Sequence, residues 1–249
     1  MPFRLVYCMY AYLSFIVCML LVFPFVVVAS FWGKMAGGNV IYKICHVWTD
    51  VWFFMIGIIH KNIFEHPLQK DKQYIFVANH ISYLDIPVIF ASVRKRSIRV
   101  LGKEEMKKIP IFGFIYSRGA VMVDRGSAEK RAKSVRHLKS ILQKGVSIFI
   151  YPEGTFNETH RPLKDFYDGA FRIAIETKTP IQPVLFLDTY DRMHYGSIFS
   201  LRPGRSRSVY LEEVSVEEFS LKEVGALKKK VYELMEKKLL EYKASWIES

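Results

Sequence analysis

The stretch Phe76–Pro87, FVANHISYLDIP, decides how the rest of the chain is interpreted. The apolar run Tyr74–Ala78, which leads into it, has the composition of a buried strand. His80 follows the end of this run, and Asp85 comes five positions later. A carboxylate at that spacing can keep a proton on one imidazole nitrogen and leave the other free to act as a general base. The same pattern also allows Asp85 to be the N-cap of a helix, with Pro87 in its first turn.

Strand-like and helix-like segments alternate through the rest of the chain. We predict strands at Tyr74–Ala78, Ser97–Leu101, Ala120–Val123, Ser147–Tyr151, Ile181–Leu187 and Ser208–Val214. We predict helices at Ile86–Val93, Ile111–Ser117, Ser127–Lys144, Tyr167–Thr177 and Ser220–Ile247. This alternation predicts an α/β fold with a mostly parallel or mixed sheet and helices on both of its faces. Ligands bind at the carboxyl ends of such strands, so His80, Arg125 and Glu153 are expected on one edge.

The N-terminal part is apolar enough for a membrane. From Leu5 to Gly33 there are 29 consecutive residues without a charge, and about 20 apolar residues span a bilayer. A second apolar stretch, Ile44–His60, contains Asp50, so a re-entrant or interfacial helix fits it as well as a second span. We therefore predict a membrane-embedded helical hairpin over residues 1–62, followed by the α/β domain over residues 63–249.

The composition indicates the chemical class of the partner. The 36 Lys and Arg residues outnumber the 24 Asp and Glu residues, which gives a net charge of +12 and predicts an anionic partner. A membrane surface accounts for this charge, and no nucleic-acid-binding motif is present, so we expect no nucleic acid. The three cysteines, Cys8, Cys18 and Cys45, lie in the apolar part, and their spacing is not that of a disulfide framework or a metal site.

Four short blocks carry a resemblance to a known family. They are Asn79–His80 with Asp85, Gly119–Arg125, Tyr151–Thr155 and Thr179–Val184. In order and spacing they resemble the glycerolipid acyltransferase family, in particular the 1-acylglycerol-3-phosphate acyltransferases. The resemblance covers roughly residues 73–187, and the N-terminal hairpin is similar to the one that this family carries.

The resemblance implies a reaction. A fatty acyl group would pass from acyl carrier protein or coenzyme A to the sn-2 hydroxyl of 1-acylglycerol-3-phosphate, giving phosphatidic acid without a further cofactor. His80 would be the general base and Asp85 would orient it. No G-x-S-x-G motif is present and no cysteine lies near the blocks, so nothing supports an acyl-enzyme. The partners would be a lysophospholipid, an acyl thioester and the surface of the cytoplasmic membrane, with the active site facing the cytosol where acyl thioesters are found.

The same resemblance implies an acceptor site. Its expected members are Lys103, Arg125, Glu153, Gly154 and Thr155. Arginine offers a bidentate fork to a phosphate and lysine a point charge, which suits a phosphorylated acceptor. The sequence also allows plainer roles, with Arg125 in a surface ion pair and residues 152–155 in an ordinary turn.

One residue departs from the family pattern. The third block usually reads E-G-T-R, whereas here Phe156 follows Thr155. Arg161 is a possible substitute for the missing arginine. The departure also allows an acceptor without a phosphate, such as a lyso-aminolipid acylated on a hydroxyl. A lipid-binding membrane module without catalysis is a further alternative, although it gives no reason for the blocks to gather on one edge. A metallohydrolase is disfavoured because the sequence has no H-E-x-x-H motif.

Overall fold

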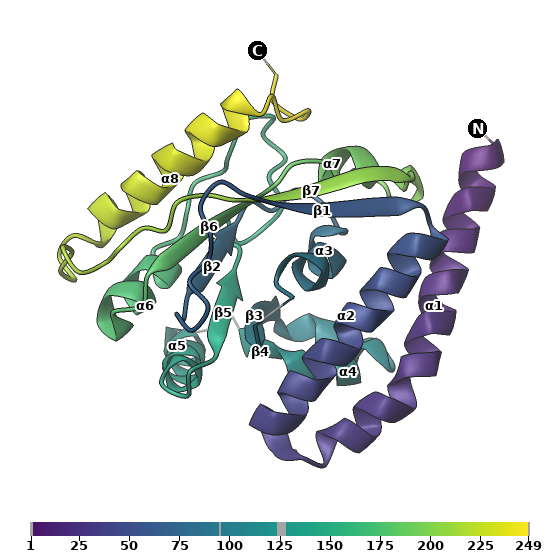
Figure 1. Cartoon of the computed structure of the whole chain (residues 1–249), viewed down its shortest axis with the longest axis horizontal. Coiled ribbons are helices and arrows are strands. Elements are labelled where there is room, and N and C mark those ends of the chain that lie inside the picture. Colours follow the sequence, from purple (N-terminus) through teal and green to yellow (C-terminus); the bar gives the residue numbers. More distant parts are fainter. Residues whose placement is uncertain (1, 95, 124–127, 249) are drawn as a thin grey trace.

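The computed structural model describes residues 2–94, 96–123 and 128–248. In this part of the chain, a seven-stranded sheet has the order β1-β7-β6-β2-β5-β3-β4 (Figure 1). The strands are β1 (Ile58–Phe64), β2 (Ile75–Ala78), β3 (Ile98–Lys103), β4 (Ala120–Val123), β5 (Ser147–Ile150), β6 (Ile181–Phe186) and β7 (Gly204–Tyr210). Neighbouring strands pair in parallel, except that β6 and β7 are antiparallel. The mixed sheet confirms the predicted α/β fold.

Helices cover both faces of the sheet. They are α1 (Pro2–Ser30), α2 (Gly38–Met55), α3 (Asp85–Ser92), α4 (Phe112–Gly119), α5 (Ala128–Leu142), α6 (Gly169–Thr177), α7 (Thr189–Arg192) and α8 (Val224–Glu241). Shorter turns of helix are η1 (Gly33–Gly37), η2 (Glu104–Lys108) and η3 (Ile198–Ser200). Figure 1 shows α5, α6 and α8 on one side of the sheet and α1 to α4 on the other.

The alternation of side chains along β2 explains the two layers. Phe76 and Ala78 point into a core that contains residues of α1, α2 and α3. Ile75 and Val77 point into a second core, which they share with residues of α5, α6 and α8. Since successive side chains of a strand face opposite ways, a strand that is apolar at every position must be covered twice. All four residues of β2 are buried, as that requires.

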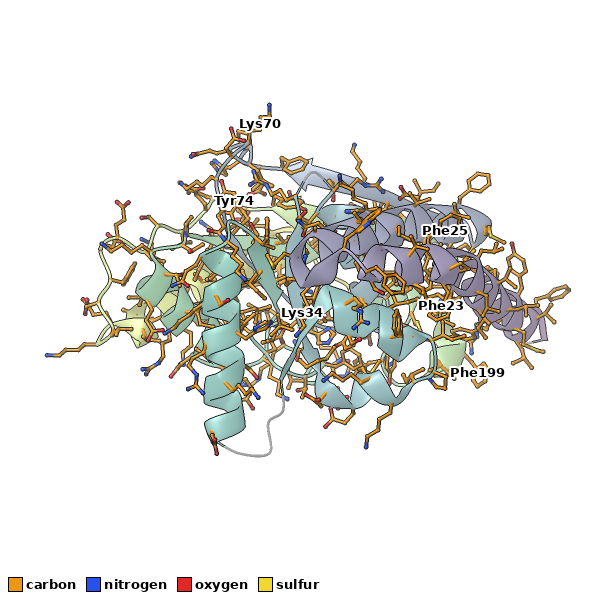
Figure 2. The ribbon with its side chains drawn as sticks, turned by 90° about the horizontal axis from the view of Figure 1, so that it is seen from below. Phe23, Phe25, Lys34, Lys70, Tyr74 and Phe199 are labelled. Carbon is orange, nitrogen blue, oxygen red and sulfur yellow. The ribbon has the colours of Figure 1, made fainter. Side chains whose placement is uncertain are left out.

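The helical hairpin belongs partly to the core. Phe3–Ser30 is the helix, among the described residues, that is long and apolar enough to cross a membrane. It exposes large apolar side chains such as Phe25, whereas the ring of Phe23 lies 5.7 Å from that of Phe114. Figure 2 labels Phe23 and Phe25. Helix α2 instead buries Trp48 and Trp52 in the same core as α3. The hairpin therefore contributes to the packing of the domain.

The strand β1 was not predicted. We interpreted Ile44–His60 as one apolar stretch, but α2 ends at Met55 and β1 begins at Ile58. Gly57, at φ 65°, makes the turn between them. Strand β1 pairs with β7 across residue 62, where we placed the division between hairpin and domain. Its side chains alternate only loosely between buried and exposed, so its sequence carries little strand signal.

Candidate active site

The candidate active site begins where β2 ends, at the edge of the sheet. The side-chain amide of Asn79 hydrogen-bonds the backbone of Phe186 in both directions, at 3.0 Å and 2.8 Å. This pairing continues the contact between β2 and β6 for one more residue. The chain then leaves the sheet at His80, which stands at the carboxyl end of the strand, as predicted from the sequence.

His80 and Asp85 form a hydrogen-bonded pair. His80 Nδ1 lies 2.8 Å from Asp85 Oδ2, which also accepts the backbone N–H groups of Ile81 at 2.7 Å and Ser82 at 2.8 Å. The Asp85 side chain is fully buried, whereas that of His80 is 15% exposed. A carboxylate accepts from Nδ1 only when that nitrogen carries the proton, so the pair leaves Nε2 as the basic nitrogen. No described residue hydrogen-bonds Nε2.

The helix-cap alternative for Asp85 is not what the structure shows. Helix α3 begins at Asp85, its N-cap is Leu84, and no side chain caps its first turn. The Asp85 carboxylate points back to the turn that holds His80. The five-residue spacing thus produces an orienting contact.

Two aromatic rings fix the imidazole from other segments. Tyr151 stacks on His80 with ring centroids 4.0 Å apart and an interplanar angle of 12°, and Phe156 meets it edge-on at 4.5 Å. The Tyr151 hydroxyl donates to the Asp85 backbone carbonyl at 2.9 Å. Burial raises the pKa of Tyr151 well above its ordinary value, so the hydroxyl stays a donor. Tyr151 follows the last residue of β5 and shares a core with Phe149, two positions earlier, and this alternation could have indicated the contact from the sequence.

Glu153 supports the backbone of His80. Its side chain is fully buried. Oε1 accepts the backbone N–H of His80 at 2.8 Å, and Oε2 accepts that of Lys164 at 2.9 Å. The His80 carbonyl in turn accepts from the backbone N–H of Asn157 at 2.7 Å. Both carboxyl oxygens are thus engaged with the chain itself, and the geometry gives Glu153 a positioning task besides the acceptor role that we predicted for it.

This burial makes a prediction about pH. Burial raises the pKa of Glu153 from 4.5 to about 8, against the opposing effect of its two backbone donors. The folded protein therefore holds a proton that the unfolded chain loses above pH 4.5. Between these two values the stabilisation from Glu153 is lost as pH rises, by up to about 1.4 kcal/mol per pH unit. Thermal unfolding midpoints across this range should fall less steeply in Glu153→Gln than in the wild type. The exposed Glu158→Gln should keep the wild-type slope, and equal slopes in all three proteins would contradict the prediction.

The other predicted acceptor residues lie around this edge. Gly154 has φ 73°, and its N–H donates to the Tyr151 carbonyl, so residues 151–154 form a turn. Thr155 is exposed and accepts from Lys164 Nζ at 2.9 Å. Lys103 ends β3, on the same edge of the sheet as His80, with an exposed side chain.

Two arginines complete the account of the predicted site. Arg125 lies outside the described residues, and the substitute Arg161 is exposed. The structure therefore brings His80, Asp85 and Glu153 into direct contact, and it shows Lys103 on the same edge without a contact to them.

An apolar cavity lies near the His80–Asp85 pair. It has a volume of about 240 Å³ and lies between the hairpin and α3. Its walls include Phe15 and Trp52 from the hairpin, Ile86 from α3, and Tyr83, whose ring centroid is 4.9 Å from that of Phe156. Phe156 thus contacts both the imidazole and a residue of the cavity wall. Among the described residues, no group of three or more His, Cys, Asp and Glu side chains could hold a metal ion.

The arrangement suits proton abstraction from a hydroxyl. It consists of an imidazole that is 15% exposed, a buried carboxylate that fixes its tautomer, and an apolar cavity nearby. A histidine held in this way can act as a general base for the attack of a hydroxyl on an activated carbonyl. The three cysteines are buried in the hairpin, far along the chain from this edge.

Comparison with known proteins finds matches among acyltransferases. The profile of the acyltransferase family matches residues 61–187. The 1-acyl-sn-glycerol-3-phosphate acyltransferase of Salmonella typhimurium is 31% identical over 172 residues, which are 67% of this chain and 67% of that protein. An enzyme of the same description from Chlamydomonas reinhardtii is 30% identical over 154 residues, 61% of this chain, and the alignment spans only 45% of that longer protein.

A solved structure extends the likeness to the hairpin. The crystal structure of the 1-acyl-sn-glycerophosphate (LPA) acyltransferase PlsC from Thermotoga maritima has a TM-score of 0.77 and 25% identity. The superposition covers 98% of this chain and 100% of that one. Given this shared fold, a family profile over half of the sequence and a relative aligned across two thirds of both chains, the chain belongs to the acyltransferase family.

Proposed function

We propose that the chain transfers a fatty acyl group from an acyl thioester to the sn-2 hydroxyl of 1-acylglycerol-3-phosphate. His80 Nε2 takes the hydroxyl proton while the oxygen attacks the thioester carbonyl. The tetrahedral intermediate collapses to the ester of phosphatidic acid, and the thiolate of acyl carrier protein or coenzyme A leaves and is protonated. The observation that carries the proposal is the 2.8 Å contact from His80 Nδ1 to the fully buried Asp85. The names of the relatives support the acceptor.

The apolar surroundings support a lipid substrate. The cavity of about 240 Å³, with Tyr83 and Ile86 in its wall, offers a hydrocarbon chain a place near the segment that carries His80 and Asp85. Helix α1 exposes apolar side chains over much of its length, and the chain carries a net charge of +12. Both features suit attachment to an anionic membrane surface, where positive side chains contribute roughly 1 kcal/mol each. The active site would face the cytosol, which supplies acyl thioesters.

Phe156 favours a second acceptor class. Its ring packs on both His80 and Tyr83, so the position that carries an arginine in the resembling family here presents an apolar edge to the imidazole. An acceptor with a hydroxyl but no phosphate, such as a lyso-aminolipid, needs no cation at residue 156. A competition assay decides between the two acceptors. Purified protein is given one acyl thioester with lysophosphatidic acid and a phosphate-free lysolipid together, and each product is quantified.

Phe156→Arg should shift that competition toward the phosphorylated acceptor. Hydrogen bonds to charged groups contribute about 1.5–3 kcal/mol, so the new guanidinium should raise the ratio of phosphorylated to phosphate-free product on the order of tenfold. The ratio is the useful measure, because lost packing on His80 slows both reactions alike. Phe156→Leu removes the ring without adding charge and should leave the ratio unchanged. The same ratio in Phe156→Arg and Phe156→Leu would show that no phosphate comes near residue 156.

A further inference from the structure

A second cavity lies at the opposite edge of the sheet from His80. It has a volume of about 270 Å³ and lies where β3 and β4 begin, between the hairpin turn, the end of α4 and the last turns of α5. Lys34 of the hairpin turn, labelled in Figure 2, stands at its wall. Nothing in the proposed reaction uses this cavity.

Basic groups from separate segments converge on it. They come from the hairpin turn, from β3, from the end of α4 and from α5: Lys34, Arg99, Arg118, His137 and Lys144. No Asp or Glu is found among its described lining residues. Ordinary surface lysines and arginines are interspersed with carboxylates, so a cavity lined by four cations and a histidine is a distinct electrostatic feature.

Arg99 is the buried member of this group. It is 4% exposed, and its guanidinium donates to the backbone carbonyls of Ile98 at 2.9 Å, Lys34 at 3.2 Å and Met35 at 3.0 Å. The chain closes tightly around it, because a Cβ on Gly38 would collide with the guanidinium. In the described part of the chain no carboxylate pairs with Arg99. A buried charge without a counter-charge is costly, and neutral carbonyls compensate it only in part.

The charges around the cavity repel one another. Burial lowers the pKa of Arg99. The pKa of His137 is also lowered, by burial first and then by the positive charges of Lys34 and Lys144. An anion in the cavity would relieve both effects. Arginine and lysine together are the donor set that proteins use for phosphate oxygens.

We propose that this cavity binds a phosphate group, carried either by an anionic lipid headgroup or by a soluble phosphate. The phosphate bridges Lys34 of the hairpin turn to Arg99 of β3 and to Lys144 beyond the end of α5, and so fastens the hairpin to the sheet. The site is independent of the acyl-transfer chemistry, because it lies at the amino ends of the strands and not at the carboxyl ends where His80 stands.

Two probes separate the two sources of phosphate. The first is inorganic phosphate added to the full chain in uncharged detergent, with sodium chloride of equal ionic strength as the reference and thermal unfolding as the readout. The second is reconstitution into vesicles of phosphatidylcholine, with or without phosphatidylglycerol. Hydrogen exchange of residues 33–38 is then followed, because a clamped turn opens less often. Ligand binding to the folded state raises the unfolding midpoint.

Matched variants make the result specific. Lys34→Gln combined with Lys144→Gln removes two exposed cations from the cavity and leaves the buried Arg99 in place. Lys222→Gln combined with Lys229→Gln makes the same charge change on the exposed region around α8. The cavity variant should bind the active probe at least about tenfold more weakly, whereas the control should match the wild type.

Each outcome decides the proposal. Stabilisation by inorganic phosphate beyond that by chloride, lost only in the cavity variant, supports a soluble phosphate. Slower exchange only in vesicles with phosphatidylglycerol, again lost only in the cavity variant, supports a lipid headgroup. The cavity binds no phosphate if neither probe affects the wild type. The same conclusion follows if each probe has equal effects on the cavity variant and on the α8 control. Neither readout requires catalysis, so the result stands whether or not the proposed reaction is correct.

Discussion

His80→Ala is expected to lower the rate of acyl transfer by about 10²–10⁴, the range that a positioned general base contributes. The variant loses the imidazole that the buried Asp85 orients. Among the described groups, only the backbone N–H groups of Ile81 and Ser82 then still hydrogen-bond Asp85 Oδ2, and neither can act as a base. The fold should persist, because neither of the two hydrophobic core clusters includes His80. The measurement is product formed from an acyl thioester and lysophosphatidic acid under single-turnover conditions.

A second histidine provides the control for this result. His66 is exposed and lies in the loop between β1 and β2, so His66→Ala changes the same residue type away from the edge. It should keep wild-type activity, and both variants should keep the wild-type unfolding midpoint within a few degrees. A folded His80→Ala protein that still turns over at the wild-type rate would rule out His80 as the base. A loss of activity together with a loss of folded protein would call for His80→Gln, which keeps a polar side chain of similar reach.

Local spacing explains what the sequence could predict at the site. His80 and Asp85 are five residues apart on one tight turn, so their contact depends on little else. The contact from His80 to Glu153 joins residues 73 apart, and the stacking of Tyr151 depends on β5 lying beside β2. From the sequence we could predict only that these segments follow the carboxyl ends of strands and so lie on one edge of the sheet. The register of the strands, which the sequence does not reveal, decided that Glu153 would meet the backbone of His80.

The fold was predicted least well where the sequence mixes signals. Strand β1 follows an apolar helix after a two-residue turn, and Lys61 and Asn62 interrupt its apolar pattern. Its partner is β7, more than a hundred residues later, so only the assembled sheet defines it. The charge at Asp50 led us to regard a re-entrant or interfacial helix as fitting this stretch as well as a second span. Asp50 has a partner in Arg94, with one contact at 2.8 Å. Helix α2 is therefore compatible with the domain surface as well as with lipid.

Asp85→Asn is the second substitution with a large expected effect. An amide of the same shape can still accept the backbone N–H groups of Ile81 and Ser82 through its oxygen. It carries no charge to stabilise the imidazolium that forms as Nε2 takes the proton. Loss of an orienting carboxylate in a Ser-His-Asp triad costs about 10⁴ in kcat, and we expect a loss of about 10²–10⁴ here. Substrate binding should change little, because Asp85 is fully buried.

The same variant also tests the tautomer directly. Asp85 Oδ1 is buried without a hydrogen-bond partner among the described residues, so the amide nitrogen placed there would be unsatisfied and destabilise the fold by about 1–3 kcal/mol. If the amide rotates to avoid this, its N–H₂ group faces His80 Nδ1 and favours the proton on Nε2, the wrong nitrogen for a base. Nitrogen NMR of labelled histidine should then report protonated Nδ1 in the wild type and a shift of the proton toward Nε2 in Asp85→Asn. The exposed Asp71→Asn should match the wild type in both spectrum and rate. A fall in kcat with an unchanged KM, accompanied by the tautomer shift, would establish that Asp85 acts through His80; a change in KM alone would mean that it acts on binding instead.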